Sequence, residues 1–133
     1  MILIKDVPLV PLQQAVFKIL KAGQTTAIYG DVSTKASLPY ITIGSVTLKP
    51  ENAKSMVFWM ATINVDVWAD TNGKRKVNDV LNDISALLSY YGPTLPVEGY
   101  KTISASIDVV EAFPEQTTGY HGTLTASFLL NKV

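Results

Sequence analysis

The sequence predicts an α+β fold, in which a mostly antiparallel sheet of about four to five strands has two helices packed on one face. Three observations lead to this prediction. Residues 57–68 alternate apolar and polar side chains with period two, as a strand on a core does. Two segments near the C-terminus alternate in the same way. Two other segments repeat apolar residues at helical spacing, so one layer of helices can bury one face of the sheet.

Composition limits the class of protein. The 133 residues suit one domain, expected to span residues 1–133. The chain has no cysteine, which excludes thiol chemistry, thiolate metal sites and disulfides. Eleven basic and eleven acidic residues give zero formal net charge, whereas proteins that grip nucleic acid usually have a basic excess. No apolar run approaches the roughly 20 residues of a membrane span, and the first one is too short for a secretory signal.

The N-terminal third predicts one helix and two strands. A helix is expected over Pro11–Ala22, with Gly23 as its natural stop. A short strand is expected in TTAIY, residues 25–29, and a second over Leu38–Gly44, where Pro39 favours an edge or a first strand position. The apolar stripe of the helix consists of Leu12, Val16, Ile19 and Leu20.

Residues Ser45–Met56 are expected to form a long solvated loop, although the first of them can extend the preceding strand. Proline, asparagine and charged residues make up much of this segment. A loop of this length in a small domain is usually functional or disordered. Lys49, Glu51 and Lys54 are therefore candidate contacts to a partner.

The strand that follows has apolar residues on both faces. Its inward face is expected to consist of Val57, Trp59, Ala61, Ile63, Val65 and Val67. On the outward face, Phe58 and Met60 lie at one end and Trp68 at the other, with polar residues between them. Large apolar groups on an outward face suggest a second covered surface. Phe58, Met60 and Trp68 are therefore candidates for a subunit interface; the alternative is that one edge of the sheet curls over them.

The C-terminal half predicts a second helix and a hairpin. Asp70, Thr71 or Asn72 can cap the helix, and Gly92-Pro93 ends it. Strands are expected over Thr102–Val110 and Tyr120–Leu130, and the short connector Phe113–Gly119 makes them antiparallel. The helix stripe is Val77, Val80, Leu81, Ile84, Leu87 and Leu88. The inward residues are Ile103, Ala105, Ile107 and Val109 on the first strand, and Leu124, Ala126, Phe128 and Leu130 on the second.

Catalytic and metal motifs are not apparent. His121 is the only histidine, and without a Cys or His companion it favours a surface or strand-edge role over metal binding or catalysis. No nucleophile elbow, phosphate loop, zinc-protease motif or dinucleotide fingerprint occurs. Asp79 and Asp83 lie one helical turn apart beside two asparagines, which permits a hard cation but more often marks the wet face of a helix. No cofactor is expected.

The basic triplet Lys74, Arg75 and Lys76 falls at the start of the second helix. Cations there oppose the helix dipole, at about 0.3–1 kcal/mol each. Asp79, four residues after Arg75 and three after Lys76, can offset part of this cost. The triplet is therefore either a locally compensated solvated turn or a contact to an acidic surface on a neighbouring subunit.

The order of these elements resembles the tail-completion, or tail-terminator, proteins of long-tailed bacteriophages, which are also called tail-to-head joining proteins. The resemblance covers nearly the whole chain, and its most specific parts are Leu38–Gly44 and the segment Thr62–Leu88, TINVDVWADTNGKRKVNDVLNDISALL. It implies an α/β fold whose subunits form a hexameric ring that caps the tail tube and docks onto the head connector. It offers no catalytic residues.

The resemblance also implies partners: other copies in the ring, the major tail-tube protein, the head-completion or connector protein, and DNA only in transient passage. It implies a virion protein made in the host cytoplasm, with no membrane contact. The loop charges and outward aromatics would then meet neighbouring subunits or the tube. Two other hypotheses remain: a small peptide- or ligand-binding module that uses a groove beside the central strand, and an enzyme with a site on His121.

Overall fold

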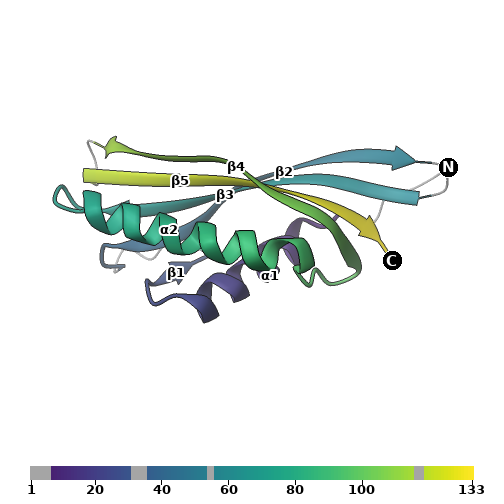
Figure 1. The fold of residues 1–133 in the computed structure, drawn as a ribbon, viewed down its shortest axis with the longest axis horizontal. Helices are drawn as coiled ribbons and strands as arrows, with labels where there is room; N and C mark the ends of the chain where they lie inside the picture. The colour runs from purple at the N-terminus through teal and green to yellow at the C-terminus, as the bar shows by residue number, and fades with distance from the viewer. Residues whose placement is uncertain (1–6, 31–35, 54–55, 116–118) are drawn as a thin grey trace.

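The computed structural model describes residues 7–30, 36–53, 56–115 and 119–133. Its five strands form one sheet in the order β1-β2-β3-β5-β4, in which only β1 runs parallel to its neighbour (Figure 1). The predicted α+β class is confirmed. The elements are α1 (Leu9–Gly23), β1 (Ile28–Tyr29), β2 (Tyr40–Ala53), β3 (Met56–Ala69), α2 (Lys74–Tyr91), the 3₁₀ turn η1 (Gly92–Thr94), β4 (Tyr100–Glu115) and β5 (Gly119–Lys132).

Both helices lie on the same side of the sheet (Figure 1). The core between them and the sheet is mostly aliphatic, with Trp59 and Phe128 as its aromatic members, because alternate residues of β3 and β5 face the stripes of α1 and α2. The predicted inward residues Ile63, Val65, Leu124 and Leu130 are fully buried. Gly122 allows the close approach of α2, since a Cβ there would lie 2.6 Å from Val77 Cγ1 and 2.8 Å from Leu81 Cδ1.

The predicted loop over Ser45–Met56 is wrong, because β2 continues to Ala53 and pairs with β3 from Met56 onward. The polar composition was misleading. Pro50 fits because no described strand pairs with the other edge of β2 over this stretch, and an edge strand tolerates proline. At the tip of this β2–β3 hairpin the inward prediction for Val57 also fails: the side chain is 42% exposed.

The alternation predicted for β4 is interrupted twice. Its register with β5 shifts between Thr102 and Ser104 and again between Ile107 and Val109, as bulges do. Each shift reverses which side chains face inward. Ile103 and Val109, predicted to be inward, are therefore 46% and 43% exposed. Thr102 is buried instead, and its hydroxyl donates to the Leu95 carbonyl at 2.8 Å.

The second helix begins slightly later than its capping signal suggested. Its N-cap is Gly73, and no side chain caps it. Asp70 instead closes the preceding turn: its carboxylate accepts from the Asn72 N–H at 3.1 Å and its carbonyl from the Gly73 N–H at 2.9 Å. Gly119 packs against this turn with φ +114°, and a Cβ there would lie 2.3 Å from the Thr71 nitrogen.

Candidate functional site

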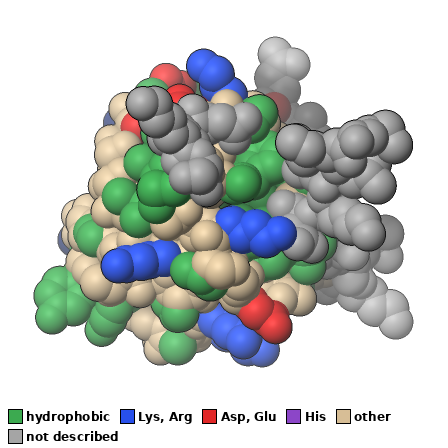
Figure 2. Space-filling model, turned by 90° about the vertical axis from the view of Figure 1, so that its right-hand side faces the viewer, with side chains coloured by type: hydrophobic (Ala, Val, Ile, Leu, Met, Phe, Trp, Pro, Cys, Tyr) green, Lys and Arg blue, Asp and Glu red, His purple; other side chains and the backbone are tan. Residues whose placement is uncertain are grey.

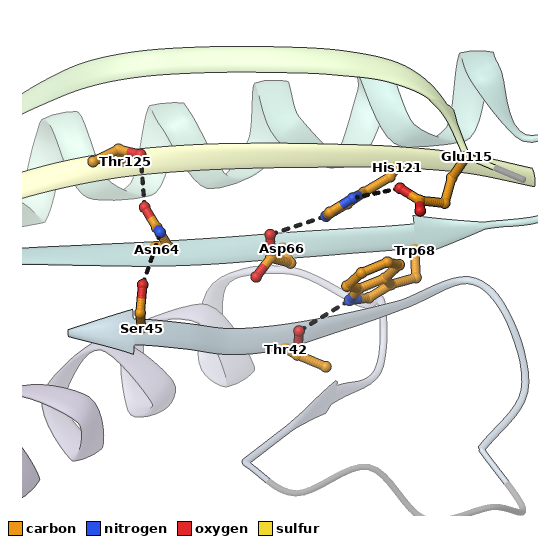
Figure 3. Close-up of polar contacts among 8 residues, drawn as sticks. All are labelled: Thr42, Ser45, Asn64, Asp66, Trp68, Glu115, His121 and Thr125. Carbon is orange, nitrogen blue, oxygen red and sulfur yellow. Dashed lines mark hydrogen bonds and ion pairs between the residues drawn. The ribbon is translucent and has the colours of Figure 1, made fainter. Parts of the chain in front are cut away.

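The face of the sheet opposite the helices, here called the polar face, carries side-chain hydrogen bonds between each neighbouring pair of the strands β2, β3, β5 and β4, and Figure 3 shows those around Asn64 and His121. Asn64 on β3 lies in its middle. Its amide nitrogen donates to the Ser45 hydroxyl on β2 at 3.0 Å, and its carbonyl accepts from the Thr125 hydroxyl on β5 at 2.7 Å. One amide thus fixes the register of three strands.

A second set of hydrogen bonds on the polar face runs from β3 through β5 to β4. The hydroxyls of Thr62 and Ser127 lie 3.2 Å apart, and Ser127 in turn donates to the Asp108 carboxylate. Ser106 donates to the other Asp108 oxygen at 3.1 Å. Asp108 lies at the second bulge of β4 and faces the polar side, as Ser106 two residues earlier does.

His121 lies at the centre of a cluster near the start of β5 (Figure 3). Its Nε2 is 2.9 Å from Asp66 on β3, and its Nδ1 is 3.3 Å from Glu115 on β4. The ring stacks on Trp68 with centroids 3.8 Å apart and meets the edge of Phe113 at 4.9 Å. Only the imidazolium form has an N–H on both nitrogens and can donate to both carboxylates.

The predicted contact residues Phe58, Met60 and Trp68 all lie on the polar face and are half-buried within the subunit. Trp68 makes the most contacts within its own subunit, because it stacks on His121 and its Nε1–H also donates to the Thr42 hydroxyl at 3.0 Å. Phe58 and Met60 lie near the tip of the β2–β3 hairpin. Neither the interface role nor the edge-curling alternative is decided by a single chain, so both remain predictions.

The structure brings part of the predicted loop together with these aromatics. In the β2–β3 ladder, Lys49 lies opposite Met60 and Glu51 opposite Phe58, and both charged residues are exposed. Lys54 lies outside the described residues. Figure 2 shows this end of the molecule, where hydrophobic side chains lie among those of Lys and Arg. We call Lys49, Glu51, Phe58 and Met60 the hairpin patch.

The basic triplet is separate from the hairpin patch. Lys74, Arg75 and Lys76 are exposed in the first turn of α2, at the opposite end of the sheet from the hairpin tip (Figure 1). The predicted offset by Asp79 is not a direct ion pair, because among the described residues no salt bridge joins Asp79 to Arg75 or Lys76. The triplet therefore remains available to a partner.

Groups suited to catalysis or metal binding are few among the residues that the structure describes. Among the described residues, no three or more His, Asp or Glu side chains are placed to hold a metal ion. Asp79 and Asp83 are exposed on α2. The hollows on the surface are open grooves; one of about 520 Å³ lies between α1 and β2, not beside the central strand as the ligand-binding alternative expects.

The sequence did not predict the polar network, although several of its residues were recognisable as outward polar positions. The outward series Thr62, Asn64 and Asp66 and the series Thr123, Thr125 and Ser127 were visible as polar positions on alternating strands. What they bond to depends on strand order and register. The His121 cluster in particular joins residues 55 and 6 positions apart in the sequence.

The fold is that of a chain found in a phage-like particle. It is similar to a solved structure described as "Virion of native gene transfer agent (GTA) particle", with a TM-score of 0.72 and 17% sequence identity over 90% of this chain and 94% of that chain. At this identity the likeness concerns the fold alone.

The family is shown by sequence. The chain belongs to the tail completion protein gp17 family, whose family model matches residues 14–131. It is therefore a structural protein of a bacteriophage tail, and the resemblance seen in the sequence is confirmed. No curated protein sequence matches the chain significantly. None of the described helices is long and apolar enough to cross a membrane.

Proposed function

We propose that this protein caps the completed tail tube as a ring, expected to be a hexamer, and provides the surface that joins the tail to the head connector. The observation that carries the proposal is the match of the tail completion family to residues 14–131. The similar fold in a gene transfer agent virion agrees with it. The protein would be made in the host cytoplasm and would have no enzymatic activity, cofactor or membrane contact.

The polar face and the hairpin patch support a role in contacts between proteins. An antiparallel sheet commonly leaves one face in contact with water, but that face is then polar, whereas here it carries the apolar side chains of Phe58 and Met60 near its end. We assign the hairpin patch to the tail tube or to a neighbouring subunit. The exposed triplet Lys74, Arg75 and Lys76, at the opposite end of the sheet, would meet an acidic partner surface.

Charge supports transient passage of DNA. The chain has no net formal charge, so it lacks the basic excess that holds phosphates. Across the middle of the polar face the described ionisable side chains are Asp66, Asp108, Glu111, Glu115 and His121, and no lysine or arginine lies among them. A ring with such a surface toward its channel would let DNA pass without retaining it.

Mixing the purified protein with tail-tube subunits tests the proposal. We expect light scattering to report a complex larger than the tube alone, and electron micrographs to show density at tube ends. The free protein can be monomeric, because a head-to-tail interface closes only when its rotation is right and the tube can supply that template. A protein that stays monomeric beside tubes and leaves their ends unlabelled is not a tail cap.

A pair of variants localises the contact. Phe58→Ser with Met60→Ser should abolish tube-end labelling without unfolding the protein, since both side chains are only half-buried. Tyr90→Ser is the matched control, because Tyr90 is 77% exposed but lies on α2, away from the polar face. Equal labelling by the double variant and the control would remove the hairpin patch from the interface.

A further inference from the structure

The two edges of the sheet carry opposite charges, and one of them is basic. Helix α1 beside β2 contains Lys18 and Lys21 and no acidic residue. Both lysines are exposed, and neither has a carboxylate partner among the described residues. Lys21 Nζ lies over the Phe17 ring at 5.7 Å from its centroid. We call Phe17, Lys18, Lys21 and Ile43 the α1 flank.

A groove in the α1 flank can accept side chains of a partner. It has a volume of about 520 Å³ and is lined by Phe17, Lys18 and Ile43, among others. β1 pairs only with Ile41 and Thr42, so from Ile43 onward no described strand pairs with this edge of β2. The groove thus combines a partly apolar lining, a lysine rim and an uncovered strand edge.

The C-terminal part of the opposite edge, residues 106–115 of β4, is acidic and apolar. Residues 106–115, SIDVVEAFPE, contain three carboxylates and no basic residue. Asp108 and Glu115 accept hydrogen bonds within the chain, whereas Glu111 is exposed and has no partner among the described residues. Val109 and Val110 beside it are 43% and 45% exposed. We call Val109, Val110 and Glu111 the β4 flank.

A single chain cannot bring these two flanks together. The order β2-β3-β5-β4 places three interstrand spacings between β2 and β4, which is about 14 Å. Two copies can bring the α1 flank of one against the β4 flank of the other, because the two flanks do not overlap and lie on opposite edges. A contact between two different patches is heterologous, so it repeats from copy to copy and gives a closed ring when the rotation fits.

We propose that the β4 flank of one copy docks against the α1 flank of a second copy. Val110, which faces the helix side of the sheet, covers the groove beside Phe17 and Ile43, and Glu111 at the exposed strand edge lies beside Lys18 and Lys21. The proposal rests on the proposed function in one respect, namely that the protein works as a ring of identical subunits. Beyond that function, it specifies which two surfaces meet and that neighbouring subunits are arranged head to tail.

The chemistry of the contact predicts a weak, salt-sensitive interaction. The charges lie at a solvent-exposed rim, where they fix orientation more than affinity and are screened by salt. The apolar part involves only a few half-exposed side chains. Association should therefore weaken when the ionic strength rises, and it should strengthen when a template holds several copies close together.

Cysteine cross-linking tests which surfaces meet, because the natural chain has no cysteine to interfere. The variant with Lys18→Cys and Glu111→Cys is treated with a bis-maleimide shorter than the separation of the flanks. A ladder of trimers and larger species is expected, at about tenfold the yield of a Lys18→Cys, Glu98→Cys control. A yield no higher than that control, at the highest soluble concentration, overturns the proposal.

Charge reversal tests the direction of the contact. Lys18→Glu and Glu111→Lys should each weaken self-association about five- to tenfold, because each sets like charges against each other. An equimolar mixture of the two variants should recover it, because alternating copies restore an opposite pair at every contact. The doubly reversed chain should recover it as well. Failure of both the mixture and the doubly reversed chain to recover association contradicts the head-to-tail contact.

These outcomes separate the flank contact from the capping function. A cross-linked ladder from a protein that never labels tube ends would support the contact and remove the capping role. Tube-end labelling by the wild type and by the two charge variants alike, with no ladder, would keep the capping role and remove the contact. Circular dichroism of each variant shows whether it is folded before either conclusion is drawn.

Discussion

The two faces of the sheet use the same strands in opposite ways. Along β3, the inward residues Ala61, Ile63 and Val65 have no exposed surface, whereas the outward residues between them are half-exposed and polar. The inward face is aliphatic and covered by helices. The outward face is held by hydrogen bonds across strands and has no covering layer in the single chain. The difference indicates that one face determines stability while the other is available for contacts.

The largest expected effect is on the inward face. Ile63→Ala removes a fully buried side chain beneath the helices and should lower the free energy of unfolding by about 2–5 kcal/mol. Thr62→Ala, its neighbour on the polar face, loses one hydroxyl contact and should cost no more than about 1 kcal/mol. Urea denaturation measures both values. Equal losses would contradict the division between the two faces.

A smaller loss is expected where α2 meets the sheet. Gly122→Ala would place a Cβ 2.6 Å from Val77 Cγ1, so the helix must shift, at about 1–3 kcal/mol. Gly30→Ala is the control, because no atom lies within 4 Å of the added Cβ and the backbone needs no glycine there. Thermal unfolding should separate the two variants. A neutral Gly122→Ala would mean that the approach of α2 to β5 is not tight.

The inward face was also the more predictable of the two. The inward residues of β5 and most of those of β3 were read directly from period-two alternation, because burial acts on each residue by its own polarity. The failures at Ile103, Val109 and the segment after Gly44 have one cause. Bulges and hairpin pairing depend on a neighbouring strand, which the local sequence does not reveal.

For the polar face, the sequence predicted which residues point outward but not which of them contact one another. Sequence alternation placed Asp66 outward, but it did not place Glu115 and His121 on neighbouring strands beside it, and it gave His121 no partners. The hairpin patch was identified as a set of residue types, yet its pairs Lys49–Met60 and Glu51–Phe58 needed the ladder register. Local periodicity therefore predicts which side a residue faces better than which residues meet.

The cluster around His121 should contribute moderately to stability. His121→Phe keeps the aromatic stack on Trp68 but leaves Asp66 and Glu115 without their shared donor, at about 1–2 kcal/mol. Adding Asp66→Asn should not add its full separate cost, because the two side chains form one network. A double-mutant cycle by chemical denaturation measures this coupling. Strictly additive losses would show that the cluster does not act as a unit.

The smallest effect on stability, and one of opposite sign, is expected from the basic triplet. Changing Lys74, Arg75 and Lys76 to Gln removes cations from the N-terminal turn of α2, where each is unfavourable by about 0.3–1 kcal/mol. The free energy of unfolding should therefore stay constant or rise slightly. If the triplet meets an acidic partner, tail joining should weaken although the protein is no less stable.

Opposite changes in stability and assembly are what distinguish a contact surface from a structural one. Lys101→Gln is the matched control, since Lys101 is an exposed lysine on β4, away from the α2 terminus. It should leave tail joining unchanged. Infectious-particle counts with each variant supplied in place of the wild type measure joining, and thermal unfolding measures stability. Normal joining by the triple Gln variant would show that the triplet contacts no partner in the tail. The three cations would then be a solvated helix end that opposes the helix dipole.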